Sequence, residues 1–131
     1  MKKMHIAYKF RIYPNTEQKI LIHKTIGACR FIWNKMLEDK MNHYELTKEM
    51  LYNTPARYKE TYSFLNEVDS LALANRQLHL ERAFKSFFSK QTNFPNFQAR
   101  KKDYGYTTNL VNENIKVLDG FIKLPKLGLV K

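Results

Sequence analysis

This sequence is poor in cysteine, glycine and proline, and it contains no long apolar run. Its single cysteine, Cys29, excludes an intrachain disulfide framework and a cysteine-rich zinc ribbon. The 4 glycines and 4 prolines leave little room for flexible linkers. No apolar run approaches the ~20 residues that span a bilayer, and Lys9 and Arg11 interrupt any apolar stretch of a signal peptide. We therefore expect a cytoplasmic protein with no membrane partner.

Acidic residues are also scarce. The 12 Asp and Glu residues face 23 Lys and Arg residues, which gives a formal net charge of +11 and favours an anionic partner. Nucleic acid and an anionic membrane surface are the two main partners that such a charge allows, and of these we expect nucleic acid. The apolar share of 44%, with 9 Phe, 8 Tyr and 1 Trp, is enough for a core. We expect one compact domain or two small lobes of one chain.

Candidate catalytic and metal-binding groups are few. The four histidines are not spaced as a metal pair: His5, His23, His43 and His79. Glu67 and Asp69 are the nearest approach to a carboxylate pair, but Asp69 is better placed to cap a helix, and two-metal nucleases need several converging carboxylates. Cys29 fits a buried thiol better than a nucleophile. The sequence predicts a binding protein, not an enzyme, with no metal or other cofactor.

The first half of the chain predicts a strand followed by a long helix. Apolar and polar residues alternate from 4 to 13, which indicates a half-buried strand with a basic outer face, and Pro14 ends it. Asn15 and Gln18 then have the spacing of a capping box, and a helix follows over about 16–44. Gly27 lies inside this helix, where it indicates a close helix crossing.

The second half predicts further helices and then strands. Residues 46–52 suit a short helix, and Pro55 either starts or breaks another. Asp69 is expected to cap a helix that runs to about 90. Residues 104–108 are rich in strand formers, and Asp119-Gly120 predicts a tight hairpin over 115–124. A two-residue turn there pairs Leu118 with Phe121, Val117 with Ile122, Lys116 with Lys123 and Ile115 with Leu124.

This order of elements predicts an α+β fold. A lone N-terminal strand is not stable by itself, so it should pair with the C-terminal strands in a small barrel or sheet. Residues 1–14 and 94–131 would then form one β domain, and residues 15–93 would form a helical lobe inserted into it.

Two stretches carry basic groups without acidic neighbours. One stripe of the second long helix contains no carboxylate and consists of Asn75, His79, Arg82, Ser86 and Lys90. Arg76 lies beside this stripe. Such donors suit phosphates and base edges, although an ordinary exposed face would have the same composition. No acidic residue occurs from Arg82 to Lys102. Phe94 and Phe97 precede the basic run 100–102, so they suit either stacking on single-stranded nucleic acid or packing at the helix-to-strand junction.

Several segments resemble, in order, those of the TnpB/OrfB family of transposon-encoded, RNA-guided nucleases. Residues 8–14 (YKFRIYP) resemble the opening strand of these proteins, and residues 27–34 (GACRFIWN) resemble the first-helix motif. The same holds for residues 65–69 (LNEVD), 82–88 (RAFKSFF), 94–97 (FPNF) and 122–128 (IKLPKLG). Together they cover nearly the whole chain.

The resemblance implies a wedge domain with an oligonucleotide-binding-like barrel, and an inserted recognition lobe, often labelled a helix-turn-helix domain. Full-length members bind a guide RNA and a short DNA motif next to the target, and guide pairing reads the rest. A RuvC-like domain with three acidic residues and a zinc-binding insert then cuts the DNA. We expect that domain to be absent here, because the sequence ends at Val130-Lys131. A short segment between Tyr44 and Glu67, and Ala74 at an often polar position, predict altered DNA-motif contacts.

On this interpretation the sequence predicts two sets of binding residues. The RNA-binding residues are Lys9, Arg11, Arg30, Phe94, Phe97, Arg100, Lys101 and Lys102. The DNA-binding residues are Ser70, Asn75, Arg76, His79, Arg82 and Asn112. The partners would be guide RNA, target DNA and a separately encoded nuclease half, with no cleavage by the chain alone. A stand-alone helix-turn-helix DNA-binding regulator and an inert remnant of a truncated transposase gene remain as alternatives.

Overall fold

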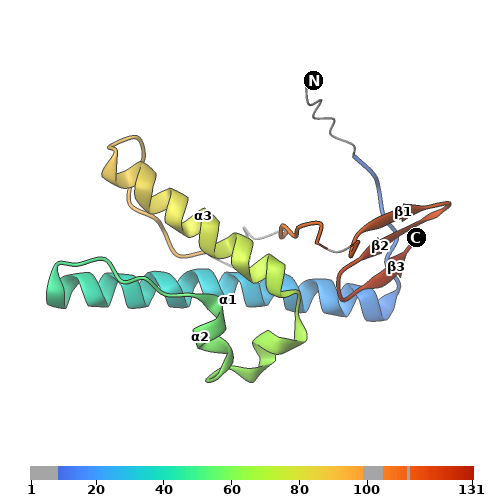
Figure 1. Cartoon of the computed structure of the whole chain (residues 1–131), viewed down its shortest axis with the longest axis horizontal. Coiled ribbons are helices and arrows are strands. Elements are labelled where there is room, and N and C mark those ends of the chain that lie inside the picture. The colour runs from blue at the N-terminus through green and yellow to red at the C-terminus, as the bar shows by residue number, and fades with distance from the viewer. Residues whose placement is uncertain (1–8, 99–104, 112) are drawn as a thin grey trace.

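The computed structural model describes residues 9–98, 105–111 and 113–131 (Figure 1). These residues form helices and one small sheet, which confirms the α+β class. The elements are α1 (Thr16–Thr47), α2 (Pro55–Lys59), the 3-10 helix η1 (Ser63–Glu67), α3 (Ser70–Phe88), β1 (Lys116–Leu118), β2 (Phe121–Leu124) and β3 (Gly128–Val130).

The long helix α1 begins as predicted. The Asn15 side chain accepts a hydrogen bond from the Gln18 backbone N–H at 2.8 Å, and the Gln18 side chain accepts one from the Asn15 N–H at 2.9 Å. This capping box satisfies two amides that have no partner inside the helix. Gly27 does not mark a close crossing with any described helix, since among the described residues a Cβ there would meet only the Arg30 guanidinium, at 3.5 Å. That prediction was wrong.

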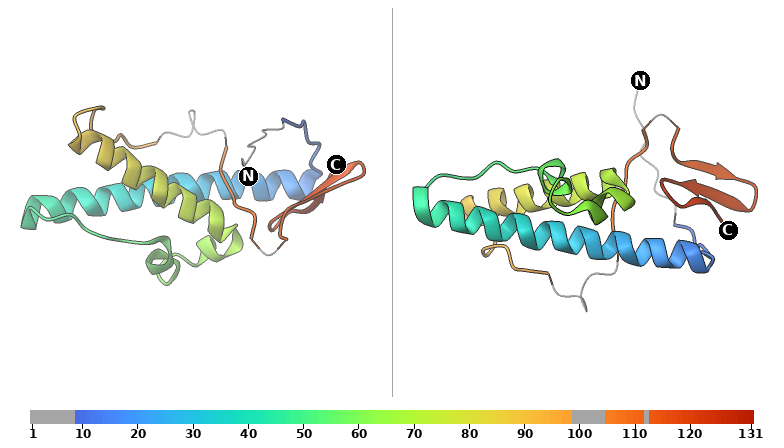
Figure 2. Two further views of the ribbon diagram at one scale, coloured as in Figure 1. Left: turned by 45° about the horizontal axis from the view of Figure 1, so that its top comes forward. Right: turned by 90° about the horizontal axis from the view of Figure 1, so that it is seen from below.

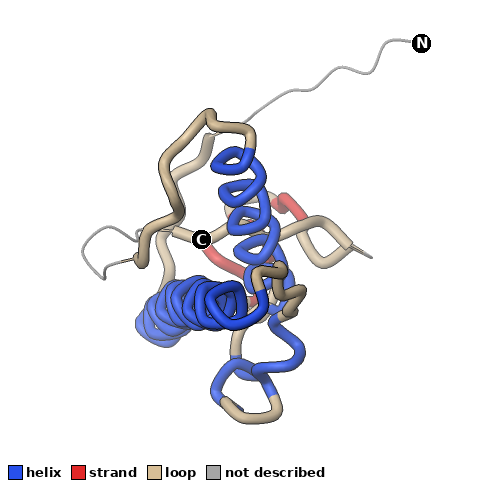
Figure 3. Tube along the Cα trace, turned by 90° about the vertical axis from the view of Figure 1, so that its left-hand side faces the viewer, coloured by secondary structure: helices blue, strands red, loops and turns tan. Residues whose placement is uncertain are grey.

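The hydrophobic core lies between α1 and α3, the main helix pair of the fold. Figure 3 looks nearly along α1 and shows α2 and α3 beside it. The side chains of Ile32 and Met36 on α1, and of Leu73 and Leu80 on α3, are fully buried. Burying each such side chain contributes about 1.5–3 kcal/mol. Cys29 is also fully buried in this core, as predicted.

The connection between α1 and α3 differs in part from expectation. Residues 48–54 are not helical, so the predicted short helix over 46–52 is wrong. A buried amine holds this segment instead: Lys40 Nζ donates to the Leu51 carbonyl at 2.7 Å. Burial lowers the pKa of Lys40, and the nearby Glu81 carboxylate opposes this shift. Pro55 starts α2, and Asp69 caps α3 by accepting from the Leu71 N–H at 3.0 Å.

The sheet is antiparallel, with strand order β1-β2-β3. The hairpin has the predicted register, with Lys116 opposite Lys123, Val117 opposite Ile122 and Leu118 opposite Phe121. Gly120 in its turn has φ +77°, a conformation that L side chains avoid. The third strand, β3, was not predicted; it pairs with β2 through the turn at residues 125–127. The described residues form this three-stranded sheet rather than a barrel.

The N-terminal segment lies against the sheet without joining it as a strand. Residues 9–15 have no regular structure, so the predicted strand is wrong for 9–13, and its residues 4–8 lie outside the described ones. The Tyr13 N–H donates to the Lys131 carbonyl at 2.6 Å, beside the end of β3. Gln18 of α1 donates to the carbonyls of Leu127 and Leu129 at 3.2 and 2.7 Å. These bonds hold the sheet beside the N-terminal end of α1 (Figure 1).

The segment after α3 turns back along α1 (Figure 2). Residues 105–111 contain no strand, so that part of the expected strand at 104–108 is wrong, while residue 104 is outside the described ones. Several side chains of α1 and α3 bind the backbone of this segment instead. The predicted division between a β domain and a lobe at residues 15–93 stays a prediction.

Candidate nucleic-acid interface

A hollow of about 810 Å³ lies over the middle of α1, between the residues just before α3 and the segment after it. We call it the Gly27 hollow. Its lining combines aromatic rings with charged groups from three separate parts of the chain: Lys24, Gly27, Ala28, Arg30, Phe31, Asn34, Lys35, Glu38, Phe64, Glu67, Val68 and Phe97. It therefore brings together two of the predicted RNA-binding residues, Arg30 and Phe97.

Aromatic side chains form one wall of the Gly27 hollow. Phe31 meets the rings of Tyr62 and Phe64 edge to face, with centroid distances of 4.7 and 5.2 Å. Phe64 keeps 43% of its surface exposed, and Phe97 keeps 55%. Sequence reasoning missed Phe64, because its only signal was an aromatic residue in the poorly patterned stretch between the two long helices.

Hydrogen bonds from α1 fix the segment that carries Phe97. Asn34 Nδ2 donates to the Gln98 carbonyl at 3.0 Å, and the Gln98 N–H donates to Asn34 Oδ1 at 2.7 Å. Trp33 Nε1 donates to the Asn96 carbonyl at 2.7 Å. Phe97 is thus held on both sides of its own backbone. Sequence reasoning missed these partners too, although Trp33 and Asn34 belong to the first-helix segment 27–34.

Two of the three cations that line the Gly27 hollow lie beside a carboxylate of the lining, and the third, Arg30, does not. Lys24 lies 3.9 Å from the Glu67 carboxylate, and Lys35 lies 3.9 Å from that of Glu38. Such exposed pairs are weak. Among the residues that the structure describes, no carboxylate lies within ion-pair distance of Arg30. Its guanidinium lies over Gly27, 3.5 Å from the place that a Cβ would take there.

The predicted stripe on α3 divides into a buried and an exposed part. Asn75 and Arg76 are each only 8% exposed. Asn75 donates to the carbonyls of Leu71 and Thr107, and Arg76 donates to Gln98 Oε1 at 2.6 Å and to the Gly105 carbonyl at 3.0 Å. Asn75 therefore does not belong to an exposed face. Both side chains hold the segment after α3 in place, and DNA contact by either stays a prediction.

The rest of the stripe faces outward. His79, Arg82 and Lys90 are exposed, Ser86 is half-buried, and Ser70 is exposed at the start of α3. Partial burial, followed by the positive charges of Arg76 and Arg82, lowers the pKa of His79. An anion beside the ring would oppose this shift, because a nearby negative charge favours the protonated form.

The N-terminal segment and the sheet form a second basic region. Lys9 and Arg11 are exposed, and Arg11 borders a groove of about 220 Å³ between residues 10–12 and the sheet. Lys116 and Lys123 face each other in the hairpin, as predicted. Glu113 lies 3.5 Å from Lys116 and reduces the repulsion between the two lysines.

The two candidate stacking phenylalanines have different surroundings. Phe94 meets Phe84 and Phe87 edge to face at 5.4 and 5.2 Å, so it packs at the end of α3 while remaining 38% exposed. Phe97 lines the Gly27 hollow. The packing alternative thus describes Phe94, whereas Phe97 keeps the exposure that stacking needs. Arg100, Lys101, Lys102 and Asn112 lie outside the described residues.

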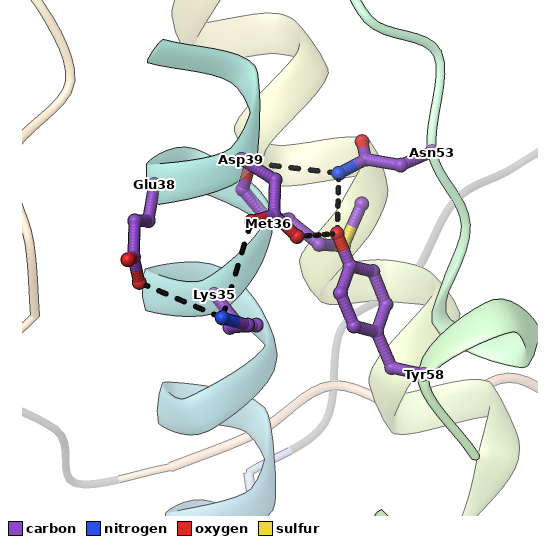
Figure 4. Close-up of polar contacts among 6 residues, drawn as sticks. All are labelled: Lys35, Met36, Glu38, Asp39, Asn53 and Tyr58. Atoms are coloured by element: carbon purple, nitrogen blue, oxygen red, sulfur yellow. Dashed lines mark hydrogen bonds and ion pairs between the residues drawn. The ribbon is translucent and has the colours of Figure 1, made fainter. Parts of the chain in front are cut away.

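A hydrogen-bonded cluster fixes α2 on α1 (Figure 4). The Tyr58 hydroxyl donates to Asp39 Oδ2 at 2.6 Å and accepts from Asn53 Nδ2 at 2.8 Å. Burial and the bond to Asp39 raise the pKa of the Tyr58 phenol. Lys35 lies beside the same carboxylate at 4.0 Å. The cluster consists of residues that sequence reasoning did not select, and it positions the chain that leads to Phe64.

The carboxylates considered for catalysis have other partners. Asp69 caps α3 and Glu67 lies beside Lys24. Within residues 9–98, 105–111 and 113–131, no group of three or more His, Cys, Asp and Glu side chains could hold a metal ion. None of the described helices is long and apolar enough to cross a membrane.

Residues 1–49 match a protein-family model described as a helix-turn-helix domain, HTH_OrfB_IS605. In the structure, the described part of this region contains one uninterrupted helix, α1, and not two helices joined by a turn. The predicted helix-turn-helix label therefore names a family match rather than a motif within residues 9–49.

Three curated proteins are similar in sequence. One from Streptomyces pristinaespiralis, named "Putative RNA-guided DNA endonuclease", is 33% identical over 109 residues, which are 78% of this chain and 27% of that protein. The "Putative RNA-guided DNA endonuclease InsQ" of Escherichia coli (strain K12) is 30% identical over 142 aligned positions, covering 100% of this chain and 34% of that protein. The "Virulence protein VsdF" of Salmonella dublin is 29% identical over 110 residues, 72% of this chain and 92% of that protein. The chain spans about a third of the length of the first two relatives.

Proposed function

Because this chain belongs to the TnpB/OrfB family and corresponds to its N-terminal region, we propose that it binds a guide RNA and a target DNA and does not cleave DNA by itself. The observation that carries the proposal is the Gly27 hollow, where Arg30, with no carboxylate in ion-pair distance among the described residues, lies in the same cavity as the half-exposed ring of Phe97. A cation beside an aromatic face is how proteins hold the backbone and bases of RNA.

The two nucleic acids would use different surfaces. RNA would contact the Gly27 hollow and the basic N-terminal region with Lys9 and Arg11, together with the predicted residues 100–102. DNA would lie along the exposed side of α3, from Ser70 past His79 and Arg82. Arg76 and Asn75 would support both surfaces, since Arg76 joins α3 to Gln98 and Asn75 joins it to the Thr107 carbonyl.

Cleavage would need groups from elsewhere. Two-metal hydrolysis requires several carboxylates around the reacting phosphate, and Glu67 and Asp69 already have structural partners. We therefore propose that a RuvC-like segment or a separately encoded nuclease half supplies them.

Binding across a salt series tests this proposal. The protein should bind structured RNA tightly, with an affinity that falls steeply as salt rises, because phosphate contacts release counterions. Arg30→Ala should weaken binding to every RNA sequence and lower the salt slope by about 1. If the protein binds no RNA at low salt, or if Arg30→Ala leaves both quantities unchanged, the proposal is wrong.

A second candidate is a DNA-binding regulator that needs no RNA. The exposed, acid-free side of α3 favours it, as does the description of the matching family model. Duplex DNA is the discriminating ligand. Binding to duplex in the absence of RNA, and more tightly than to RNA, would support the regulator; no binding to either would support an inert remnant.

A further inference from the structure

We infer that the Gly27 hollow is a site for one unpaired nucleotide of single-stranded RNA, whose base lies on Phe97 and whose phosphate lies on Arg30. The inference rests on the proposed RNA binding and goes beyond it, because it specifies one cavity, one nucleotide and the side chains that hold each part.

The size and walls of the hollow suit a base. Its volume of about 810 Å³ lies in the range of small-molecule sites. Phe97 and Phe64 leave 55% and 43% of their surfaces open. Bases stack on such faces whatever their sequence, because every base has a π-face. A base inside a duplex is already stacked and paired, so the occupant must come from a single strand.

The charges suit one phosphate. The lining carries three cations and two carboxylates, and two of the cations, Lys24 and Lys35, lie beside those carboxylates. Arg30 is the cation that remains. The carboxylates of Glu38 and Glu67 disfavour entry of further phosphates, so only the phosphate next to the bound base should contact the hollow, at Arg30.

The site is formed before any ligand arrives. Asn34 and Trp33 of α1 hold the backbone on both sides of Phe97 with three hydrogen bonds of 2.7–3.0 Å. A ring on a backbone that is already held loses less freedom when a base stacks on it, which favours binding.

Gly27 of α1 lines this site. Glycine inside a helix is unfavourable, and here neither a positive φ nor a crossing with a described helix requires it, because within the described part of the chain a Cβ would meet only Arg30. An alanine Cβ would make an ordinary van der Waals contact with the Arg30 guanidinium at 3.5 Å, whereas a longer side chain would reach into the space that Arg30 and the hollow occupy. A larger side chain at this position should fill the hollow from below without entering the core.

Two variants test the site without touching the core. Phe97→Ala removes the stacking face, and Gly27→Leu fills the floor, so each should weaken binding of a short oligoadenylate RNA by about five- to a hundredfold. Gly27→Ala shares the gain in helix propensity but leaves the hollow open, and should bind as the parent protein does. Phe88→Ala is the control for ring removal, since Phe88 is 53% exposed at the far end of α3. Fluorescence anisotropy gives the affinities, and thermal unfolding shows that each variant is folded.

The outcomes separate the site from the proposed function. If the parent protein binds oligoadenylate and both Phe97→Ala and Gly27→Leu bind it equally well, the inference is overturned while RNA binding stands. Tighter, Phe97-dependent binding of oligodeoxyadenylate would overturn the assignment to RNA. If the parent protein binds neither structured RNA nor oligoadenylate, the proposed function fails and the inference falls with it.

Discussion

Asn34 and Gln98 are 64 residues apart in sequence and are joined by two hydrogen bonds, one in each direction, of 3.0 and 2.7 Å. The amide of one side chain thus satisfies both backbone groups of a residue in an irregular segment, as a neighbouring strand would. Through this pair, α1 determines where Phe97 lies. Arg76 binds the side chain of the same glutamine from α3, so both long helices hold the segment.

The first prediction concerns this pair. Asn34→Ala removes both bonds and leaves a partly buried N–H and carbonyl without a partner, so we expect the free energy of unfolding to fall by about 1–3 kcal/mol. Urea denaturation measures it. Asn42→Ala, on the exposed side of α1, is the matched control and should not destabilise, because alanine is the better helix former. Equal stability of the two variants would contradict the structural role of Asn34.

The second prediction concerns the cluster at Tyr58. Tyr58→Phe removes the hydroxyl that donates to Asp39 and accepts from Asn53, and leaves Asn53 Nδ2 with only the longer bond to the Met36 carbonyl at 3.5 Å, so the free energy of unfolding should fall by about 1–3 kcal/mol. Tyr52→Phe removes the same atom from a side chain that is 76% exposed and should have no effect. Both are compared by thermal unfolding; a Tyr58 variant as stable as the Tyr52 variant would show that the cluster contributes nothing.

Local signals allowed several features to be predicted from the sequence. The capping box of Asn15 and Gln18, the cap at Asp69 and the register around Asp119-Gly120 all depend on residues within a few positions of one another. The chemistry of each group therefore determines the geometry without knowledge of the rest of the fold.

Features that depend on distant partners could not be predicted in this way. Asn75 has the sequence spacing of an exposed stripe and Arg76 lies beside that stripe, but both are buried and bind partners 22–32 residues further along the chain. Apolar and polar residues alternate over 9–13 as in a strand, yet no described strand pairs with this segment. Arg30 and Phe97 were selected for separate reasons, and only the path of the chain after α3 shows that they share one hollow.

The third prediction concerns the hairpin turn. Gly120→Ala places a side chain at φ +77°, which costs about 1–2 kcal/mol in the left-handed region. We expect faster hydrogen exchange at the amides that pair β1 with β2, while those of α1 and α3 keep their protection. Gly105→Ala, at a position with open space and no positive φ, is the control. Unchanged exchange in the Gly120 variant would mean that the turn does not limit the hairpin.

The last prediction concerns pH and rests on His79. Its pKa in the folded protein lies below the ordinary value, first through partial burial and then through Arg76 and Arg82. The unfolded chain therefore binds a proton at His79 more readily than the folded protein does. The contribution of His79 to stability is present above the ordinary pKa and is lost as pH falls through the pKa of the folded protein.

A DNA phosphate beside the His79 ring has the opposite effect, since it raises the pKa of the ring and favours the charged form. The affinity for duplex DNA should then rise as the pH is lowered from about 7.5 to about 5.5, and binding should be accompanied by proton uptake. His79→Gln should reduce this pH dependence, whereas His23→Gln, on an exposed part of α1, should retain it. Affinities measured at both pH values decide the matter, and the same pH dependence in all three proteins would remove His79 from the DNA-binding surface.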